Sequence, residues 1–388
     1  MRYPVRRTMS LLRPGLALVG LASITPACGG DSRDDGALDP EAVLAVTENY
    51  AEMVKANYAD AREDAEALRA AVDTFVNDPT DANLGAARSA WLAARESYGQ
   101  SEAYRFYDGP IDDPIDGPEG QLNAWPMDEA YVDYVEGAPD SGIVNDAENY
   151  PTIDTELLIS LNEAGGETNI ATGYHAVEFL LWGQDLSEDG PGDRPVSDYV
   201  DDGSNNADRR ATYLKAATSL IVSDLQGLEA QWAGDYQTEF TGAAPEVALR
   251  NMLLGMGSLS GAELAGERIE VALQTRDQED EHSCFSDNTH RDIVTNATGI
   301  QNVYLGRYGN VSGPSIYELV AQRDVALADR LRDELAASVA AAEAIPAPFD
   351  RAIVEHRESV EATVDALRVQ ADTIGEVAAA FGINLALE

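Results

Sequence analysis

His175 and Glu178 are the residues whose types and spacing in this 388-residue chain point most directly to chemistry. On an α-helix, a spacing of three places both side chains on one face, near enough to share a proton or a metal ion. The residues around them are mostly apolar, so we expect a buried helix. A buried carboxylate must be paired, protonated or bound to a metal. The spacing alone leaves two interpretations open: a functional site, or a hydrogen bond that merely satisfies both groups.

A second concentration of reactive side chains, between residues 281 and 292, includes His282, Cys284 and His290. Imidazole and thiolate are suitable ligands for iron, zinc or copper. The alternative is structural: Asp287 caps the following helix, and Cys284 fills space as a small apolar residue. The pattern favours the capping interpretation without excluding ligands.

A third group lies where a helical pattern gives way to a loop rich in proline and glycine. Glu102 and Arg105 share a helix face there, which makes them candidates for the site; the alternative is an ion pair between the two with no further role. Asp112 follows in the loop itself, which cannot hold a regular helix because prolines and glycines recur every few residues.

Several familiar catalytic patterns are absent from the sequence. It contains no His-Glu-x-x-His motif, no phosphate-binding glycine loop, no Gly-x-Ser-x-Gly elbow and no paired Cys-x-x-Cys motif. These absences exclude a standard zincin protease, phosphoryl transfer and serine hydrolysis.

The elements that must position these residues are helices. Asp39 and Pro40 predict an N-cap and a first helical residue, followed by apolar positions at helical spacing. No stretch shows strand-like alternation with hairpin signals, so we predict an all-α protein made of helical bundles. An irregular stretch ending at residue 206 predicts a boundary between a domain at 40–206 and a domain at 207–388. Helices are predicted at 41–76, 82–106, 127–135, 153–161, 169–182, 207–232, 245–274, 287–306, 317–344 and 349–381.

The N-terminus reads as an export signal. Residues 1–27 combine arginines, a short apolar run and small residues before Cys28, as a signal peptide does. We expect lipidation at Cys28, a tether at 28–39, and a protein anchored to the outer membrane or free in the periplasm; secretion without a lipid is the alternative. The formal net charge of -43 repels nucleic acid and anionic lipid, so we expect no nucleic-acid partner and membrane contact only through the anchor.

Four segments together carry a family resemblance: residues 98–106, 122–126, 169–185 and 281–292. They resemble the imelysin family, and most closely its branch of iron-regulated proteins. The resemblance implies two four-helix-bundle-like domains related by duplication. It also implies that Gly173, His175 and Glu178 form a Gly-x-His-x-x-Glu signature at a cleft between the domains.

The resemblance implies a protein that binds a metal ion or a metal-bearing ligand in iron uptake, together with transporter components. Iron is the expected metal and zinc the alternative. A rival hypothesis is a metal-dependent peptidase in which Glu178 activates a metal-bound water, and a third is a structural or partner-docking lipoprotein. The expected ligands are His175 and Glu178, completed from Glu102, Asp112, Asp287 and His290, with Gly173, Arg105, Ser286, Asp185 and Arg291 in support.

Overall fold

The computed structural model describes residues 38–187, 190–203 and 205–386, and this part of the chain is an all-α fold, as predicted. Its one paired ladder joins two short strands, β1 (Arg307–Tyr308) and β2 (Val311–Ser312). Within the described residues, no helix combines the length and the apolar character needed to cross a membrane. The signal peptide and the lipidation at Cys28 lie outside the described residues.

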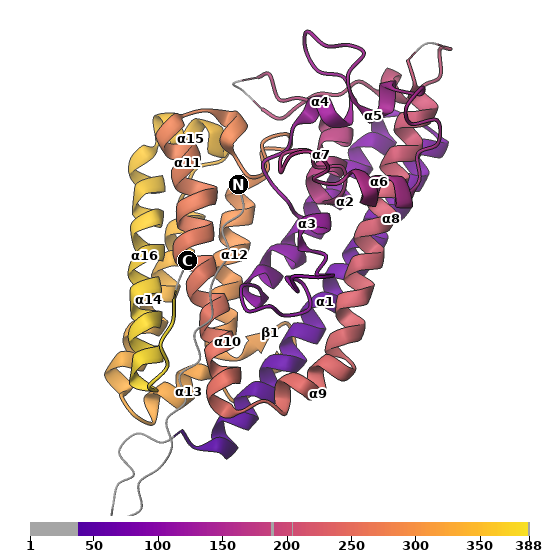
Figure 1. Cartoon of the computed structure of the whole chain (residues 1–388). Helices are drawn as coiled ribbons and strands as arrows, with labels where there is room; N and C mark the ends of the chain where they lie inside the picture. The colour runs from indigo at the N-terminus through magenta and orange to yellow at the C-terminus, as the bar shows by residue number, and fades with distance from the viewer. Residues whose placement is uncertain (1–37, 188–189, 204, 387–388) are drawn as a thin grey trace, which may run out of the picture. The chain divides into compact units, whose positions relative to one another are not determined.

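Four helices from the first half of the fold pack together (Figure 1). The long helix α1 (Pro40–Asn77) starts as predicted, because the Asp39 carboxylate accepts the Glu41 N–H and proline occupies the first turn. It packs against α2 (Asp81–Ser101) and α8 (Ala207–Trp232). The short α7 (Gly173–Trp182) packs against both α2 and α8.

Short helices and loops connect α2 to α7 and α7 to α8. The helix predicted to reach residue 106 ends at Ser101 and continues as a single 3₁₀ turn, η1 (Glu102–Tyr104). The remaining short elements are α3 (Glu119–Leu122), α4 (Glu129–Val132), α5 (Gly142–Asn145), α6 (Thr155–Leu161) and η2 (Val196–Tyr199).

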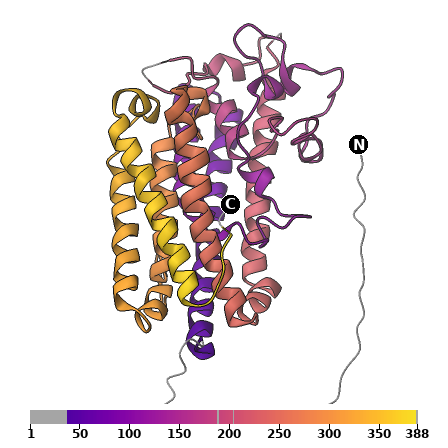
Figure 2. The same cartoon turned by 60° about the vertical axis from the view of Figure 1, so that its left-hand side comes forward.

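A second set of helices comes from the C-terminal part and stands beside the first (Figure 2). The predicted helix at 245–274 is continuous but changes its hydrogen-bonding pattern, from α10 (Pro245–Ser258) through the π-helix η3 (Leu259–Glu270) to α11 (Val271–Thr275). The other members are η4 (Gln278–Asp280), α12 (Thr289–Leu305), α13 (Ile316–Ala321), α14 (Val325–Glu343), α15 (Phe349–Glu355) and α16 (Arg357–Ala380).

The two sets meet along α2 and α12, which pack directly against each other. The short α9 (Asp235–Thr241) follows α8, and both pack on α1. The boundary expected at residue 206 therefore lies immediately before a helix that packs on α1 and α7. The α2–α12 contact brings residues of α2 and α7, residues that precede α12 and the first turn of α12 into one polar site.

Candidate functional site

Gly173 fixes the start of α7 and thereby the place of the signature. Its φ is +84°, and a Cβ there would lie 2.6 Å from the carbonyl oxygen of Leu122. Only glycine accommodates both the left-handed backbone and the close approach. Every residue of α7 is buried, so its polar side chains must find partners inside the protein.

His175 and Glu178 pair with each other, as their spacing predicts. Both are 0% exposed, and His175 Nδ1 lies 2.9 Å from Glu178 Oε2. Burial, with nearby His282 and Arg95, lowers the pKa of His175 well below its usual value, so the imidazole is neutral. Burial raises the pKa of Glu178 to about 8. Nε2 of His175 is buried and has no hydrogen-bond partner.

Ser286 holds the other oxygen of Glu178. Its backbone N–H and its hydroxyl donate to Glu178 Oε1 at 3.0 and 2.7 Å. Both carboxyl oxygens of Glu178 are therefore engaged, one by the His175 ring and one by Ser286. Ser286, expected from the sequence to support the site, thus contacts Glu178, and its functional role stays a prediction.

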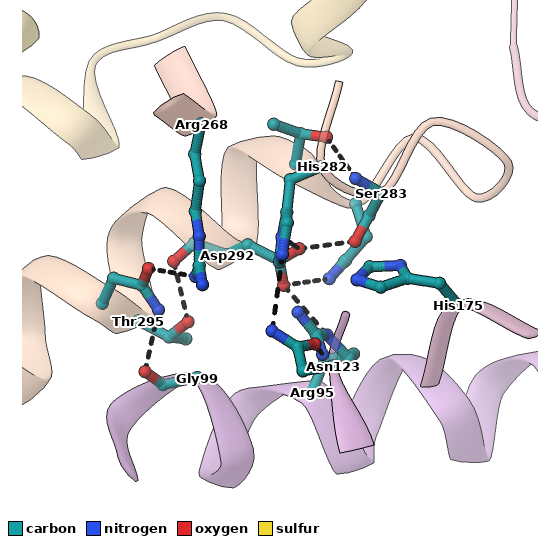
Figure 3. A network of polar contacts seen from close by, with 12 residues as sticks. Arg95, Gly99, Asn123, His175, Arg268, His282, Ser283, Asp292 and Thr295 are labelled. Carbon is teal, nitrogen blue, oxygen red and sulfur yellow. Dashed lines mark hydrogen bonds and ion pairs between the residues drawn. The ribbon is translucent and has the colours of Figure 1, made fainter. Parts of the chain in front are cut away.

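A second histidine–carboxyl pair lies beside the first. His282 Nδ1 is 3.1 Å from Asp292 Oδ2, and the ring centroids of His282 and His175 are 4.7 Å apart. Burial alone would raise the pKa of Asp292, but Arg95, whose Nε donates to Asp292 Oδ1 at 3.2 Å, and His282 hold it well below its usual range. The Ser283 hydroxyl donates to the same carboxylate at 2.5 Å (Figure 3).

A chain of polar contacts continues from Arg95 to the C-terminal helices (Figure 3). Arg95 donates to Asn123 Oδ1 at 2.5 Å, and Asn123 donates to Glu102 Oε1 at 2.6 Å. Glu102 forms a buried ion pair with Arg268. Glu102, proposed from the sequence as a ligand, is thus bonded to Asn123 and Arg268.

The π-helix η3 presents Arg268 to this network. Arg268 follows Glu263 by five residues within η3, and its Nη2 donates to Glu263 Oε1 at 2.8 Å. Although burial acts to raise it, the pKa of Glu263 falls to about 2, because Arg268 and Arg105 lie close by. π-Helical segments occur frequently at functional sites.

A cavity of about 410 Å³ opens beside the second pair. His282, Asn123, Arg268, Arg105 and Trp125 are among the side chains that line it. His175 does not line it but lies behind, with its ring centroid 5.0 Å from that of Trp125. The cavity therefore reaches His282 directly and His175 only past the rings of Trp125 and His282.

Two predicted site residues serve other contacts at the edge of this region. The alternative of an ion pair between Glu102 and Arg105 is wrong: Arg105 bonds Glu119 at 3.0 Å, because the chain turns sharply after η1. Asp112 accepts the backbone N–H groups of Phe106 and Gly109, the latter at 3.0 Å, and so shapes its own loop.

The residues predicted near the start of α12 lie apart from the central pair. Asp287 does not cap α12: Asn288 is the N-cap, and Asp287 adopts a φ of +57°. Its carbonyl oxygen lies 3.1 Å from His290 Nδ1, while Arg291 pairs with Glu96 at 2.7 Å. Among the described residues, no hydrogen bond or ion pair connects Asp287, His290, Arg291 or Asp185 to His175 or Glu178.

Cys284 is 2% exposed, and burial raises the pKa of its thiol well above the usual value. It behaves as the small apolar residue that the sequence also allowed. Across residues 38–187, 190–203 and 205–386, no three His, Cys, Asp or Glu side chains are grouped so that they could hold a metal ion together.

Sequence reasoning missed Arg95, Asn123, Asp292 and Arg268 as members of the site. A usable signal existed for Arg95, which follows the buried Trp91 by one helical turn and precedes the buried Tyr98 by three residues. An arginine on the apolar face of a helix requires a buried acid as its partner. Nothing in the sequence indicates which acid that is.

The sequence profile of the imelysin family matches residues 54–374. The chain belongs to the imelysin family. It is 25% identical over 378 residues to iron-regulated protein A of Synechococcus elongatus, covering 92% of this chain and 88% of that protein. The resemblance seen in the sequence is confirmed.

Two crystal structures share the fold of this imelysin-family protein. An iron-regulated protein A precursor from Parabacteroides distasonis superposes with a TM-score of 0.71 at 19% identity, covering 90% of this chain and 97% of that one. An imelysin-like protein from Psychrobacter arcticum gives a TM-score of 0.65 at 17% identity, covering 90% of this chain and 99% of the other. These likenesses establish the fold.

Proposed function

We propose that this imelysin-family protein binds iron, with Nε2 of His175 as its principal protein ligand, and serves iron acquisition. The observation that carries the proposal is the state of His175: Nδ1 contacts a carboxyl group, while Nε2 is buried without a partner. A histidine that binds a metal commonly uses its other ring nitrogen in this way, because the carboxylate fixes the tautomer and orients the ring. The names of two relatives, both iron-regulated proteins, agree with an iron-linked role.

Under this proposal, Glu178 orients His175 and is not itself a ligand, since Ser286 and His175 already engage its two oxygens. His282 is the second candidate ligand. Its Nδ1 contacts Asp292, and its Nε2 lies 3.4 Å from Asn123 Nδ2 beside the cavity. Imidazole nitrogen suits iron as well as zinc.

Two imidazoles leave most coordination positions of an iron ion to be filled by other groups. This favours iron that arrives within a small chelate over a bare ion. The cavity of about 410 Å³ is large enough for a small molecule. Arg105 lines it, and its Nε and Nη1 have no hydrogen-bond partner, so its guanidinium suits a carboxylate group on the chelate.

The same contacts favour binding over peptide cleavage. A peptidase of the rival type needs a carboxylate free to take a proton from a metal-bound water. Glu178 is enclosed and held on both oxygens. Chelator-sensitive cleavage of an unfolded protein that disappears in Glu178→Gln would reverse this ranking.

Equilibrium dialysis against ferric citrate, ferrous ion and zinc, with bound metal measured by mass spectrometry, tests the proposal. We expect His175→Ala to reduce affinity about tenfold or more. Glu178→Gln should also reduce metal affinity about tenfold or more, without disturbing the fold. Ser286 donates to the amide oxygen, so the amide NH₂ faces His175 Nδ1 and leaves the proton of the ring on Nε2.

His290→Ala is the matched control, because His290 contacts only the carbonyl of Asp287 in its turn. It should bind metal as the wild type does. Equal binding by the wild type, His175→Ala and Glu178→Gln for all three metal forms would refute the proposal.

A further inference from the structure

A second cavity, of about 570 Å³, shares no lining residue with the cavity beside His282. Its walls come from the segment after α7, from η4 and from α15. Acidic side chains dominate: Asp185, Asp277, Glu279, Asp350 and Glu355. Acidic residues alone do not make a binding site. Support for a ligand must come from the hydrogen bonds and the burial of each carboxyl group.

Asp185 is the group that points to a ligand. It lines this cavity and is only 2% exposed. One oxygen, Oδ1, accepts the Ser187 N–H at 3.0 Å, but Oδ2 is buried without a partner. Burial, together with neighbouring Asp350, raises the pKa of Asp185 to about 6. A buried carboxylate oxygen with no donor is unfavourable unless a cation or a proton meets it.

Glu281 is a second buried carboxyl group near Asp185. It is 1% exposed, and neither of its carboxyl oxygens has a hydrogen-bond partner. The carboxyl groups of Asp350, Asp287 and Asp185 lie near it. Several carboxyl groups thus lie close enough to oppose one another's ionisation.

The protein's own cations do not neutralise Asp185. Arg276 and Arg351 line the cavity, but neither lies close enough to Asp185 to shift its pKa, and Arg351 pairs with Glu355 at 3.2 Å. Within the part of the chain that the structure describes, no arginine or lysine forms an ion pair with Asp185 or Glu281. A cation from outside the chain can supply at Asp185 a positive charge that no arginine or lysine of the described residues supplies.

Two apolar side chains also line the cavity. They are Leu186 and Val354, which are 63% and 53% exposed. A metal ion would need several oxygens converging on one point, whereas no three carboxylates in the described residues are so grouped. An ammonium group on a hydrocarbon chain needs one carboxylate and an apolar wall.

We propose that this cavity binds a small alkylammonium compound, with its ammonium group on Oδ2 of Asp185 and its hydrocarbon part against Leu186 and Val354. The inference is independent of iron binding at His175, because the two cavities have no lining residue in common. The ammonium group donates to the buried oxygen and supplies the missing positive charge.

Isothermal titration calorimetry with 1,5-diaminopentane in 150 mM salt tests this site. We expect saturable binding by the wild type, and in Asp185→Asn a loss of affinity of about tenfold or more, since a charge-assisted bond is removed. The asparagine oxygen can still accept the Ser187 N–H, so the variant should fold; thermal unfolding followed by circular dichroism checks this. Asp208→Asn removes the same charge from an exposed position in α8 and should bind as the wild type does.

The variant Leu186→Ser distinguishes binding of an organic cation from binding of an inorganic one, because only the organic cation contacts an apolar side chain. It should weaken binding of 1,5-diaminopentane while leaving the fold unchanged. Calcium binding that depends on Asp185, without diamine binding, would overturn the proposal, as would equal diamine binding by Asp185→Asn and Asp208→Asn. Free lysine binding more tightly than the diamine would also contradict it, because the cavity would then be recognising an α-carboxylate.

Discussion

The site contains two histidine–carboxyl pairs that differ in what surrounds the acid. Asp292 is bonded by Arg95 and Ser283 as well as by His282, and its pKa is held low. Glu178 has only Ser286 beside His175, and burial raises its pKa to about 8. The two rings are 4.7 Å apart, so distance from solvent does not explain the difference; the guanidinium of Arg95 does.

This contrast separates a structural pair from one that can exchange a proton. A carboxylate beside an arginine stays ionised and holds its histidine in one tautomer. A carboxyl group with no cation bonded to it shares a proton with its histidine, and the protonation of Nε2 then depends on the environment. We infer that Asp292 stabilises the fold by holding Arg95 and His282 in place, while the His175–Glu178 pair provides the principal ligand of the proposed iron site.

The largest expected effect concerns stability. Asp292→Asn should lower the free energy of unfolding by about 3–5 kcal/mol, because Arg95 is left buried without its counter-charge. Urea unfolding followed by circular dichroism measures this change at pH 7.

Glu178→Gln is the matched change in the other pair, since it also replaces one buried acid by its amide. Among the described residues, no arginine or lysine forms an ion pair with Glu178, so the variant leaves no buried cation without its counter-charge. We therefore expect no loss of stability in this variant at pH 7. A similar loss in both variants would mean that the two pairs do not differ as described.

The sequence predicted most of the long helices and the His175–Glu178 pair because both depend on local spacing, although the helices expected at 317–344 and 349–381 are each divided in two. The boundaries of α1 and α8, and the pairing of residues three apart on α7, follow from periodicity and caps. The change from α10 to a π-helix leaves no such signature, since the residues of η3 are ordinary helix formers apart from two glycines.

The second pair and its arginine could not be predicted in the same way. Arg95 and Asp292 are separated by 197 positions, and they meet because α2 packs against α12. Spacing within one segment cannot identify a partner in another. For the same reason, Asp287 and His290 were expected in the site although their turn contacts itself.

The next prediction concerns the pH dependence of metal binding at His175. Below pH 8, Glu178 is protonated and His175 is neutral, so the pair holds two protons. Glu178 then donates to Nδ1, and the ring proton lies on Nε2, which has no lone pair to offer a metal. Zinc affinity should therefore rise about tenfold per pH unit up to about pH 8 and level off above it. Calorimetry from pH 6 to 9 measures this profile.

In buffers of different ionisation enthalpy, the binding heats should report the release of one proton below pH 8 and none above. Glu178→Gln removes the titrating group and should lose this slope. Affinity that is constant or falls with pH in the wild type would show that the Glu178 proton is not coupled to the ligand atom.

The smallest expected effect concerns Arg291, which is next to Asp292 in the sequence but does not bond it in the structure. Arg291 was expected to support the site, but it pairs with Glu96 at 2.7 Å where both side chains are about two-fifths exposed. Arg291→Ala should therefore change the free energy of unfolding by about 0–1 kcal/mol, and less at high salt, because exposed ion pairs are screened. Urea unfolding at two salt concentrations gives the value. A loss as large as that of Asp292→Asn, or weaker zinc binding, would place Arg291 within the polar network and would mean that Arg95 is not the only cation holding Asp292 ionised.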